Sequence, residues 1–231
     1  MNIKQPKHII LDFGKVIADS STGHWFITPN FYQIIGQEKI NLDEFDRILI
    51  QYDHIISSEM KNEKEEYEAF TSLYNHIAQE LPEIKNPEGL GEKIAYDFVF
   101  NDKRVKLYED TKECLKKLAE QYPLILLSDN WPSASRIMEN LGIKCYFTQI
   151  YISSIYHVQK KQGVFFDYPI NDFQINPQEA IFVDDNPTLL PIAEEKQLIP
   201  ILMDRENDHE NDSKYKRATS LVDLVNWLKS N

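Results

Sequence analysis

Residues 8–12 read HIILD and residues 180–185 read AIFVDD, so each is a short apolar run that ends in aspartate. Residues 124–128 (LILLS) and 199–204 (IPILMD) repeat the pattern with a polar ending. Runs that are apolar at almost every position, without alternation, are typical of parallel strands that are buried on both faces. The sequence therefore predicts four buried parallel strands, each followed by a polar side chain.

Stretches with helical periodicity separate the later strands, and they cover residues 108–121, 132–141 and 186–196. Residues 221–228 form a further amphipathic stretch at the end of the chain. Alternating strands and helices predict an α/β fold, specifically a Rossmann-like, doubly wound parallel sheet. The C-terminal ends of such strands share one edge, where ligands bind. We therefore expect Asp12, Ser128, Asp184 and Asp185 to converge at that edge.

Residues 20–102 have a different pattern. They contain three helical stretches, at 42–56, 63–80 and 87–100, and no run typical of a buried parallel strand. We interpret this block as an inserted α-helical cap. The α/β core then consists of residues 1–19 and 103–231.

Composition and charge exclude several classes of protein. The chain of 231 residues has 25 Lys and Arg against 37 Asp and Glu, a net charge of −12, which argues against a nucleic-acid partner. No apolar run approaches the roughly 20 residues that span a bilayer, and the start does not resemble a signal peptide. The sequence therefore predicts no membrane partner. Two cysteines without metal-type spacing favour a reduced, cytoplasmic protein. The charged stretch 204–216 is predicted to be a solvated loop, and the oligomeric state stays open.

The predicted cluster of acidic residues favours metal-assisted chemistry. Asp12, Asp184 and Asp185 would repel one another unless a cation lay between them, and a few hard oxygen ligands favour Mg²⁺, which also takes phosphate oxygens. A carboxylate that attacks phosphorus forms an aspartyl phosphate. Ser128 and the amides that follow it could hold phosphoryl oxygens. Lys160 or Lys161 could supply positive charge to the transition state.

Four segments together resemble the ordered motifs of the haloacid dehalogenase-like (HAD) superfamily of phosphohydrolases. They are HIILDFGKVIAD from residue 8, PLILLSDN from residue 123, the Lys160 region, and AIFVDDN from residue 180. The inserted helical block lies where that family carries its cap. The resemblance extends over nearly the whole chain and implies a small phosphorylated metabolite as substrate and Mg²⁺ as cofactor.

The resemblance assigns a role to the residues of the first two motifs. Asp12 matches the nucleophilic aspartate, which is also a metal ligand. Ser128 matches the residue that hydrogen-bonds the phosphoryl group, and Asp129 and Asn130 follow it in the phosphate-binding segment. Gly14 would supply the backbone carbonyl that binds the metal.

The last two motifs supply the remaining charged groups. Lys160 matches the motif lysine, although the family commonly has Lys-Pro where this chain has Lys160-Lys161, so both lysines stay open. Asp184 and Asp185 match the acidic pair that holds Mg²⁺. Asp185 is expected to bind the metal directly, and Asp184 directly or through water.

Position 14 departs from the family pattern. The family usually has a second aspartate there, which acts as general acid and base, and general acid catalysis is typically worth about 10²–10⁴-fold in rate. The first-motif sequence DFGKVI is similar to that of a branch of the superfamily that includes sugar-phosphate phosphatases and the phosphatase domain of epoxide hydrolases. We therefore expect a sugar phosphate-like substrate with a leaving group that needs little protonation, such as an anomeric, acyl or aryl phosphate.

Two alternatives remain at this stage. A catalytically weak or inactive member could bind a phosphorylated ligand or a protein without turnover, because both the second aspartate and the motif proline are missing. A 2-haloacid dehalogenase also lacks the second aspartate. However, the family's dehalogenases lose the acidic pair that Asp184 and Asp185 retain here.

Overall fold

The centre of the protein is a six-stranded parallel sheet, seen in a computed structural model that describes residues 6–57, 59–209 and 214–230. The strand order is β5 (Gln149–Ile152), β4 (Leu124–Ser128), β1 (His8–Leu11), β6 (Ala180–Asp184), β7 (Ile199–Met203) and β8 (Lys216–Ala218). The chain continues from β1 to β4 on one side and reaches β6 on the other. The order therefore reverses at β1, which is the position where such sheets bind ligands.

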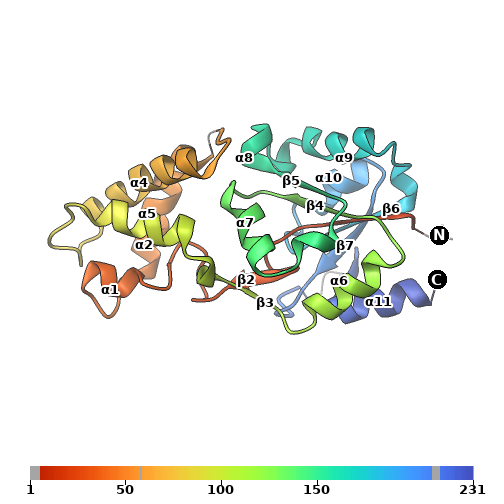
Figure 1. The fold of residues 1–231 in the computed structure, drawn as a ribbon, viewed down its shortest axis with the longest axis horizontal. Helices are drawn as coiled ribbons and strands as arrows, with labels where there is room; N and C mark the ends of the chain where they lie inside the picture. The colour runs from red at the N-terminus through yellow and green to blue at the C-terminus, as the bar shows by residue number, and fades with distance from the viewer. Residues whose placement is uncertain (1–5, 58, 210–213, 231) are drawn as a thin grey trace.

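Helices cover both faces of this sheet (Figure 1). On one face α6 (Thr111–Ala119), α7 (Ser133–Asn140) and α11 (Leu221–Lys229) pack on side chains such as Ile9 and Leu126. On the other face α8 (Ser153–Tyr156), α9 (Asp167–Asp172) and α10 (Leu190–Glu195) accompany a core around Ile10 and Phe182. Because every residue of β4 and β6 is buried, the non-alternating apolar runs are explained, and the predicted α/β fold is confirmed.

The four predicted strands are present, and the structure adds strands that the sequence pattern did not indicate. The additions are β5 and β8, at the two edges of the sheet, and the antiparallel pair β2 (Ala18–Ser20) and β3 (Val105–Leu107). Edge and two-stranded segments are partly exposed, so they lack the continuous apolar run of a buried strand. The prediction of a solvated loop over residues 204–216 is wrong at both ends, since Asp204 is buried and Lys216 is the first residue of β8. Asp204 accepts hydrogen bonds from the Asp208 and His209 amides and from Arg217, and residues 210–213 lie outside the described residues.

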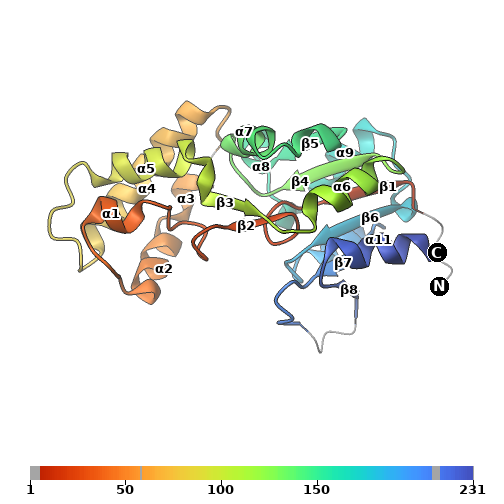
Figure 2. The same ribbon diagram turned by 60° about the horizontal axis from the view of Figure 1, so that its bottom comes forward.

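In the described residues, five α-helices and a 3-10 helix lie between β2 and β3, and we call residues 21–104 the helical unit (Figure 2). The five α-helices are α1 (Phe31–Ile35), α2 (Leu42–Gln51), α3 (Asp53–Ile56), α4 (Glu63–Glu80) and α5 (Leu90–Phe100). They enclose their own apolar core, which includes Phe70 and Phe98. Helices α4 and α5 approach closely at Gly91, where an added Cβ would lie 2.7 Å from the backbone nitrogen of Asn75. The boundaries at residues 20 and 102 stay a prediction.

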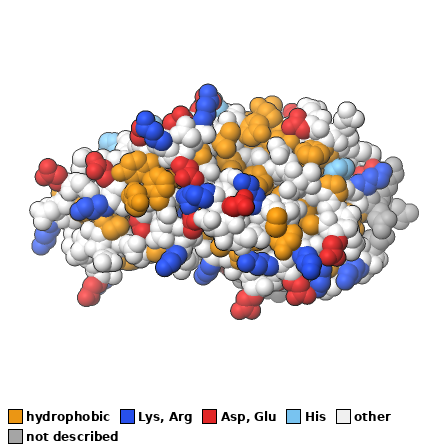
Figure 3. All heavy atoms as spheres, viewed as in Figure 1, with side chains coloured by type: hydrophobic (Ala, Val, Ile, Leu, Met, Phe, Trp, Pro, Cys, Tyr) orange, Lys and Arg blue, Asp and Glu red, His pale blue; other side chains and the backbone are white. Residues whose placement is uncertain are grey.

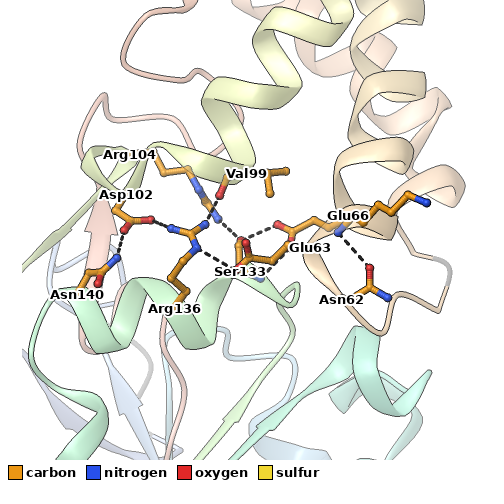
Figure 4. Close-up of polar contacts among 10 residues, drawn as sticks. Asn62, Glu63, Glu66, Val99, Asp102, Arg104, Ser133, Arg136 and Asn140 are labelled. Carbon is orange, nitrogen blue, oxygen red and sulfur yellow. Dashed lines mark hydrogen bonds and ion pairs between the residues drawn. The ribbon is translucent and has the colours of Figure 1, made fainter.

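A polar network joins the helical unit to the core (Figure 4). Glu66 of α4 is fully buried and accepts hydrogen bonds from the Ser133 amide (2.7 Å) and hydroxyl (2.6 Å) at the start of α7. Beside it, Arg136 of α7 pairs with Glu63 and Asp102. The helical unit thus caps the N-terminus of a core helix, which would otherwise leave unsatisfied amides.

Charged side chains of both signs are interspersed on the face of the molecule shown in Figure 3. None of the helices in the described residues is both long and apolar enough to cross a membrane. The expected absence of a nucleic-acid partner stays a prediction.

Glu66 makes the stability of the protein depend on pH. Burial raises its pKa from 4.5 to about 7, and the hydrogen bonds from Ser133 oppose that rise only in part. The folded state therefore holds the proton more tightly than the unfolded chain. The resulting stabilisation is full below about pH 4.5 and is lost as the pH rises through about 7. We expect Glu66→Gln to remove this contribution, which is on the order of 3 kcal/mol.

The measurement is urea unfolding of the parent protein and the Gln variant at pH 5 and pH 8. The parent should lose more stability than the variant between the two values. Equal losses would contradict the assignment of this pH dependence to Glu66.

Candidate active site

Three strand ends meet beside β1 and bring the predicted acidic residues together. Asp12 directly follows β1, and Asp184 is the last residue of β6, the strand that pairs with β1. Carboxylate oxygens of Asp12, Asp184 and Asp185 all lie within 4.8 Å of one another. Ser128, the last residue of β4, lines the same cavity as Asp12 and Asp185. The predicted convergence at the sheet edge is confirmed.

Lys160 is the lysine of the pair that lies in this cluster. Its ammonium nitrogen is 2.7 Å from Asp12 Oδ1 and 2.5 Å from Asp184 Oδ2, and its side chain is 3% exposed. Burial by itself would lower the pKa of Lys160, but the carboxylates of Asp12 and Asp184 raise it above its usual value. Lys161 is exposed. Of the two lysines, it is therefore Lys160 that places positive charge beside Asp12.

A short 3-10 helix positions Lys160 without the family's proline. Residues Lys160–Gln162 form this helix, which Gln159 and Gln162 cap reciprocally. The backbone N–H of Lys160 donates to the Asp129 carboxylate at 3.0 Å. This hydrogen bond connects the lysine segment to the end of β4. The backbone N–H of Asp129 is then the group of this residue that a phosphoryl oxygen could approach.

The other phosphate-binding candidates differ in what they can still donate. Ser128 is 2% exposed and lines the cavity. The Asn130 amide donates to Ser153 Oγ at 3.1 Å, and Asn130 Oδ1 accepts the Trp131 amide at 2.9 Å. The backbone amide of Asn130 is thus already bonded, so its side-chain NH₂ is the group through which it could contact a ligand.

The acidic residues fit a divalent cation. Asp184 accepts the Asn186 amide with one oxygen and Lys160 with the other. Burial, together with the charges of Asp12 and Asp184, raises the pKa of Asp185 to about 7, and burial also raises that of Asp184. The cluster thus combines three carboxylates, those of Asp12, Asp184 and Asp185, with the ammonium group of Lys160. This excess of negative charge and the hard oxygen donors suit Mg²⁺, with Asp185 offering the less engaged carboxylate.

The loop after Asp12 explains how a glycine fits at position 14. Val16 N donates to Gly14 O at 2.6 Å across a tight turn in which Lys15 has φ = +51°. A carbonyl oxygen has two lone pairs, so Gly14 O retains one for a metal. A Cβ at position 14 would lie 3.3 Å from Trp25 Cζ2 and 3.9 Å from Asp12 Oδ2. The indole of Trp25 therefore occupies the space that a longer side chain at position 14 would need.

The cavity above these groups has a volume of about 320 Å³ and lies between the core and the helical unit. Its aromatic lining is Trp25, Phe26 and Trp131, so the wall of the cavity is partly apolar. Phe26 and Trp131 contact each other edge to face, with ring centroids 5.8 Å apart. The full lining is Asp12, Gly14, Lys15, Trp25, Phe26, Arg104, Ser128, Asp129, Asn130, Trp131 and Asp185.

Sequence reasoning missed Arg104, a buried cation that lines this cavity. It belongs to the segment NDKR (101–104), which has the composition of a solvated turn. No local pattern distinguishes its side chain from that of an exposed arginine.

Comparison with known proteins agrees with this geometry. A model of the haloacid dehalogenase-like hydrolases matches residues 6–195. The chain therefore belongs to that family of hydrolases, as its four motifs indicate. A search of curated proteins gave no match.

Solved structures with the same fold include proteins of different activities. YfnB from Bacillus subtilis, described as bound to magnesium, has a TM-score of 0.71 at 16% identity and covers 98% of this chain and 100% of its own. A HAD phosphatase from Thermococcus onnurineus has a TM-score of 0.63 at 18% identity, covering 96% and 97%. A 2-haloacid dehalogenase from Pseudomonas syringae pv. Tomato DC3000 has a TM-score of 0.67 at 12% identity, covering 97% and 99%. At these identities the likeness shows the fold alone.

Removal of the Lys160 ammonium should destabilise the protein. Lys160→Met leaves Asp12 and Asp184 buried without a counter-charge, which typically costs about 3–5 kcal/mol. Lys161→Met is the matched control, since its side chain is exposed and should change stability by less than about 0.5 kcal/mol. The free energy of unfolding is measured at pH 8 in metal-free buffer, and equal effects of the two substitutions would contradict the assignment.

Replacement of Gly14 should reveal its contact with Trp25. We expect Gly14→Asp to lower the free energy of unfolding by about 1–3 kcal/mol, because the new side chain competes with the indole for space. In a Trp25→Ala background the same substitution should cost less. A double-mutant cycle measures the difference, and additivity within about 0.5 kcal/mol would show that the two positions do not compete.

Proposed function

We propose that the protein is a Mg²⁺-dependent phosphatase that hydrolyses a small phosphorylated metabolite through an aspartyl phosphate on Asp12. The observation that carries this proposal is the cluster of Asp12, Asp184 and Asp185 beside the Lys160 ammonium, which contacts the buried Asp12 and Asp184. Such a cluster combines a nucleophile, a cation site and a positive charge at one edge of the sheet.

The two oxygens of Asp12 would have separate tasks. Oδ1 accepts the Lys160 ammonium at 2.7 Å, which fixes the plane of the carboxylate. Oδ2 is the oxygen that the Lys160 contact does not engage, and it would attack the phosphorus. The bond from phosphorus to the leaving-group oxygen breaks, and water then attacks the phosphorus of the aspartyl phosphate to release phosphate and restore Asp12.

Other side chains would hold the transferred group. The Ser128 hydroxyl and the Asp129 amide would donate to phosphoryl oxygens, and the Lys160 charge would stabilise the negative charge of the transition state. Asp12, the Gly14 carbonyl and Asp185 would hold Mg²⁺, which would supply further positive charge at the phosphoryl oxygens. The magnesium described for YfnB supports this choice of ion.

The absence of a carboxylate at position 14 limits the substrates. With no side chain there to protonate the leaving oxygen, esters of poorly acidic alcohols should react slowly. We therefore propose anomeric, acyl or aryl phosphates, with a sugar phosphate-like group fitting the aromatic wall of Trp25, Phe26 and Trp131. A cytoplasmic location remains a prediction from cysteine usage.

The dehalogenase alternative has less support. A dehalogenase attacks carbon and needs no metal, so the acidic pair Asp184 and Asp185 beside its nucleophile would have no role in that reaction. An inactive, ligand-binding member remains compatible with Gly14. Turnover distinguishes both alternatives from the phosphatase.

The test is hydrolysis of para-nitrophenyl phosphate, whose leaving group needs little protonation. We expect activity that is lost on chelation with EDTA, restored by Mg²⁺, and reduced to the background rate by Asp12→Asn. Asp43→Asn, on the exposed first turn of α2, is the matched control and should retain activity. Turnover that survives Asp12→Asn or needs no metal would contradict the proposal.

Two further results would favour the alternatives. Halide release from 2-chloropropionate without metal would identify a dehalogenase. A Mg²⁺-dependent complex with beryllofluoride and no turnover of any phosphate ester would identify a binding protein.

A further inference from the structure

Arg104 is a buried cation in the candidate active-site cavity that the proposed chemistry does not use. It lies at the end of the helical unit, in the 3-10 helix Asp102–Arg104 that leads into β3. Its side chain lines the same cavity as Asp12 and Ser128, and the residue is 5% exposed. A charged group at this depth requires compensation from its surroundings.

Within the described residues, the compensation around Arg104 is incomplete. Its guanidinium lies 4.1 Å from the centre of the Phe98 ring, and Nη2 donates to Ser133 Oγ at 3.3 Å. The Nε–H of Arg104 is buried and has no acceptor in the described part of the chain. No carboxylate in that part forms an ion pair with the Arg104 guanidinium, whereas the neighbouring Arg136 pairs with both Glu63 and Asp102.

Glu66 does not fill this gap. It is the nearby carboxylate, but both of its oxygens are hydrogen-bonded to Ser133 rather than to Arg104. Burial raises the pKa of Glu66 to about 7, so near neutral pH it carries only part of a negative charge. Arg104 is therefore left without a direct carboxylate contact among the described residues. Burial lowers its pKa, and the nearby charge of Glu66 opposes this effect only in part.

The surroundings of Arg104 indicate which part of a substrate it could meet. Phe98, on which the guanidinium lies, stacks on Phe26 with centroids 6.0 Å apart and contacts Trp131 at 5.7 Å. Both of these rings line the cavity. Arg104 thus belongs to the aromatic wall on the side of the helical unit, whereas the phosphoryl-binding candidates follow the strands of the core.

We infer that Arg104 is a specificity-determining residue that binds a second oxyanion, a carboxylate or a further phosphate, on the leaving group of the substrate. This inference rests on the proposed function, because it takes the phosphoryl group to lie at Asp12. A planar guanidinium matches either oxyanion with two parallel hydrogen bonds. The substrate class is then a small phosphate ester with an additional acidic group.

The experiment measures equilibrium binding to the Asp12→Asn protein with Mg²⁺, so that it does not depend on turnover. 3-Phosphoglycerate and glycerol 3-phosphate form one pair of ligands, which differ in a carboxylate. Fructose 1,6-bisphosphate and fructose 6-phosphate form a second pair, which differ in a phosphate. We expect the more acidic member of at least one pair to bind about 10- to 100-fold more tightly by calorimetry, as a charge-assisted hydrogen bond would give. The pair that shows the preference identifies the oxyanion.

Three variants separate recognition from a structural role. Arg104→Gln should abolish the preference within the pair, and Arg104→Lys should retain part of it because the charge remains. Arg136→Gln alters the same contact between helical unit and core without lining the cavity, so it should leave the ratio of affinities intact. The absence of a preference in the parent, or its persistence in Arg104→Gln, would overturn the inference.

The outcomes also separate this inference from the proposed function. If para-nitrophenyl phosphate is hydrolysed and neither pair shows a preference, the phosphatase stands and the role of Arg104 is rejected. If the preference depends on Arg104 but no ester is hydrolysed by the parent protein, Arg104 binds oxyanions and the phosphatase is rejected.

Discussion

The contact of the Lys160 ammonium with the carboxylates of Asp12 and Asp184 is the interaction on which the rest of the site depends. The two carboxylates end adjacent strands, so the topology of the sheet forces them together. Without a cation between them the two carboxylates would repel each other at close range. Lys160 places its positive charge between them, and it contacts Asp12 through Oδ1 and Asp184 through Oδ2.

Much of this arrangement could be predicted from the sequence, because the strands that form it are buried on both faces. The runs ending at Asp12, Ser128 and Asp184 are apolar throughout, and the rules for parallel sheets then bring their ends together. The strands β5 and β8 could not be found in this way, since edge strands contact the core on fewer sides. Lys160 and Lys161 have the same side chain, so only the backbone geometry of the 3-10 helix distinguishes them.

Arg104 and Glu66 could not be predicted, for a different physical reason. Both belong to charged stretches, and local sequence indicates exposure for each. They become buried only because the helical unit packs on the core, which is a long-range event with no local pattern. Asp204 differs, because its three hydrogen-bond donors come from residues only four, five and thirteen positions later in the same part of the core.

Trp25, from the helical unit, and Gly14, from the core, both shape the site beside Asp12. The loss of a side chain at position 14 leaves space, and an indole from the helical unit fills it. An apolar ring thus lies where the family usually has a carboxylate. Under the proposed function, such a site would favour leaving groups that need no proton.

The pairing of β2 with β3 has a consequence for how such proteins diversify. Ser20 and Val105 are partners in this ladder, so the chain leaves the core and returns to it at points about 5 Å apart. Any inserted sequence whose two ends meet at that spacing could replace the helices between them without disturbing the sheet. The helical unit, which would select the substrate, and the α/β core, which would carry out the reaction, could therefore evolve independently within one chain.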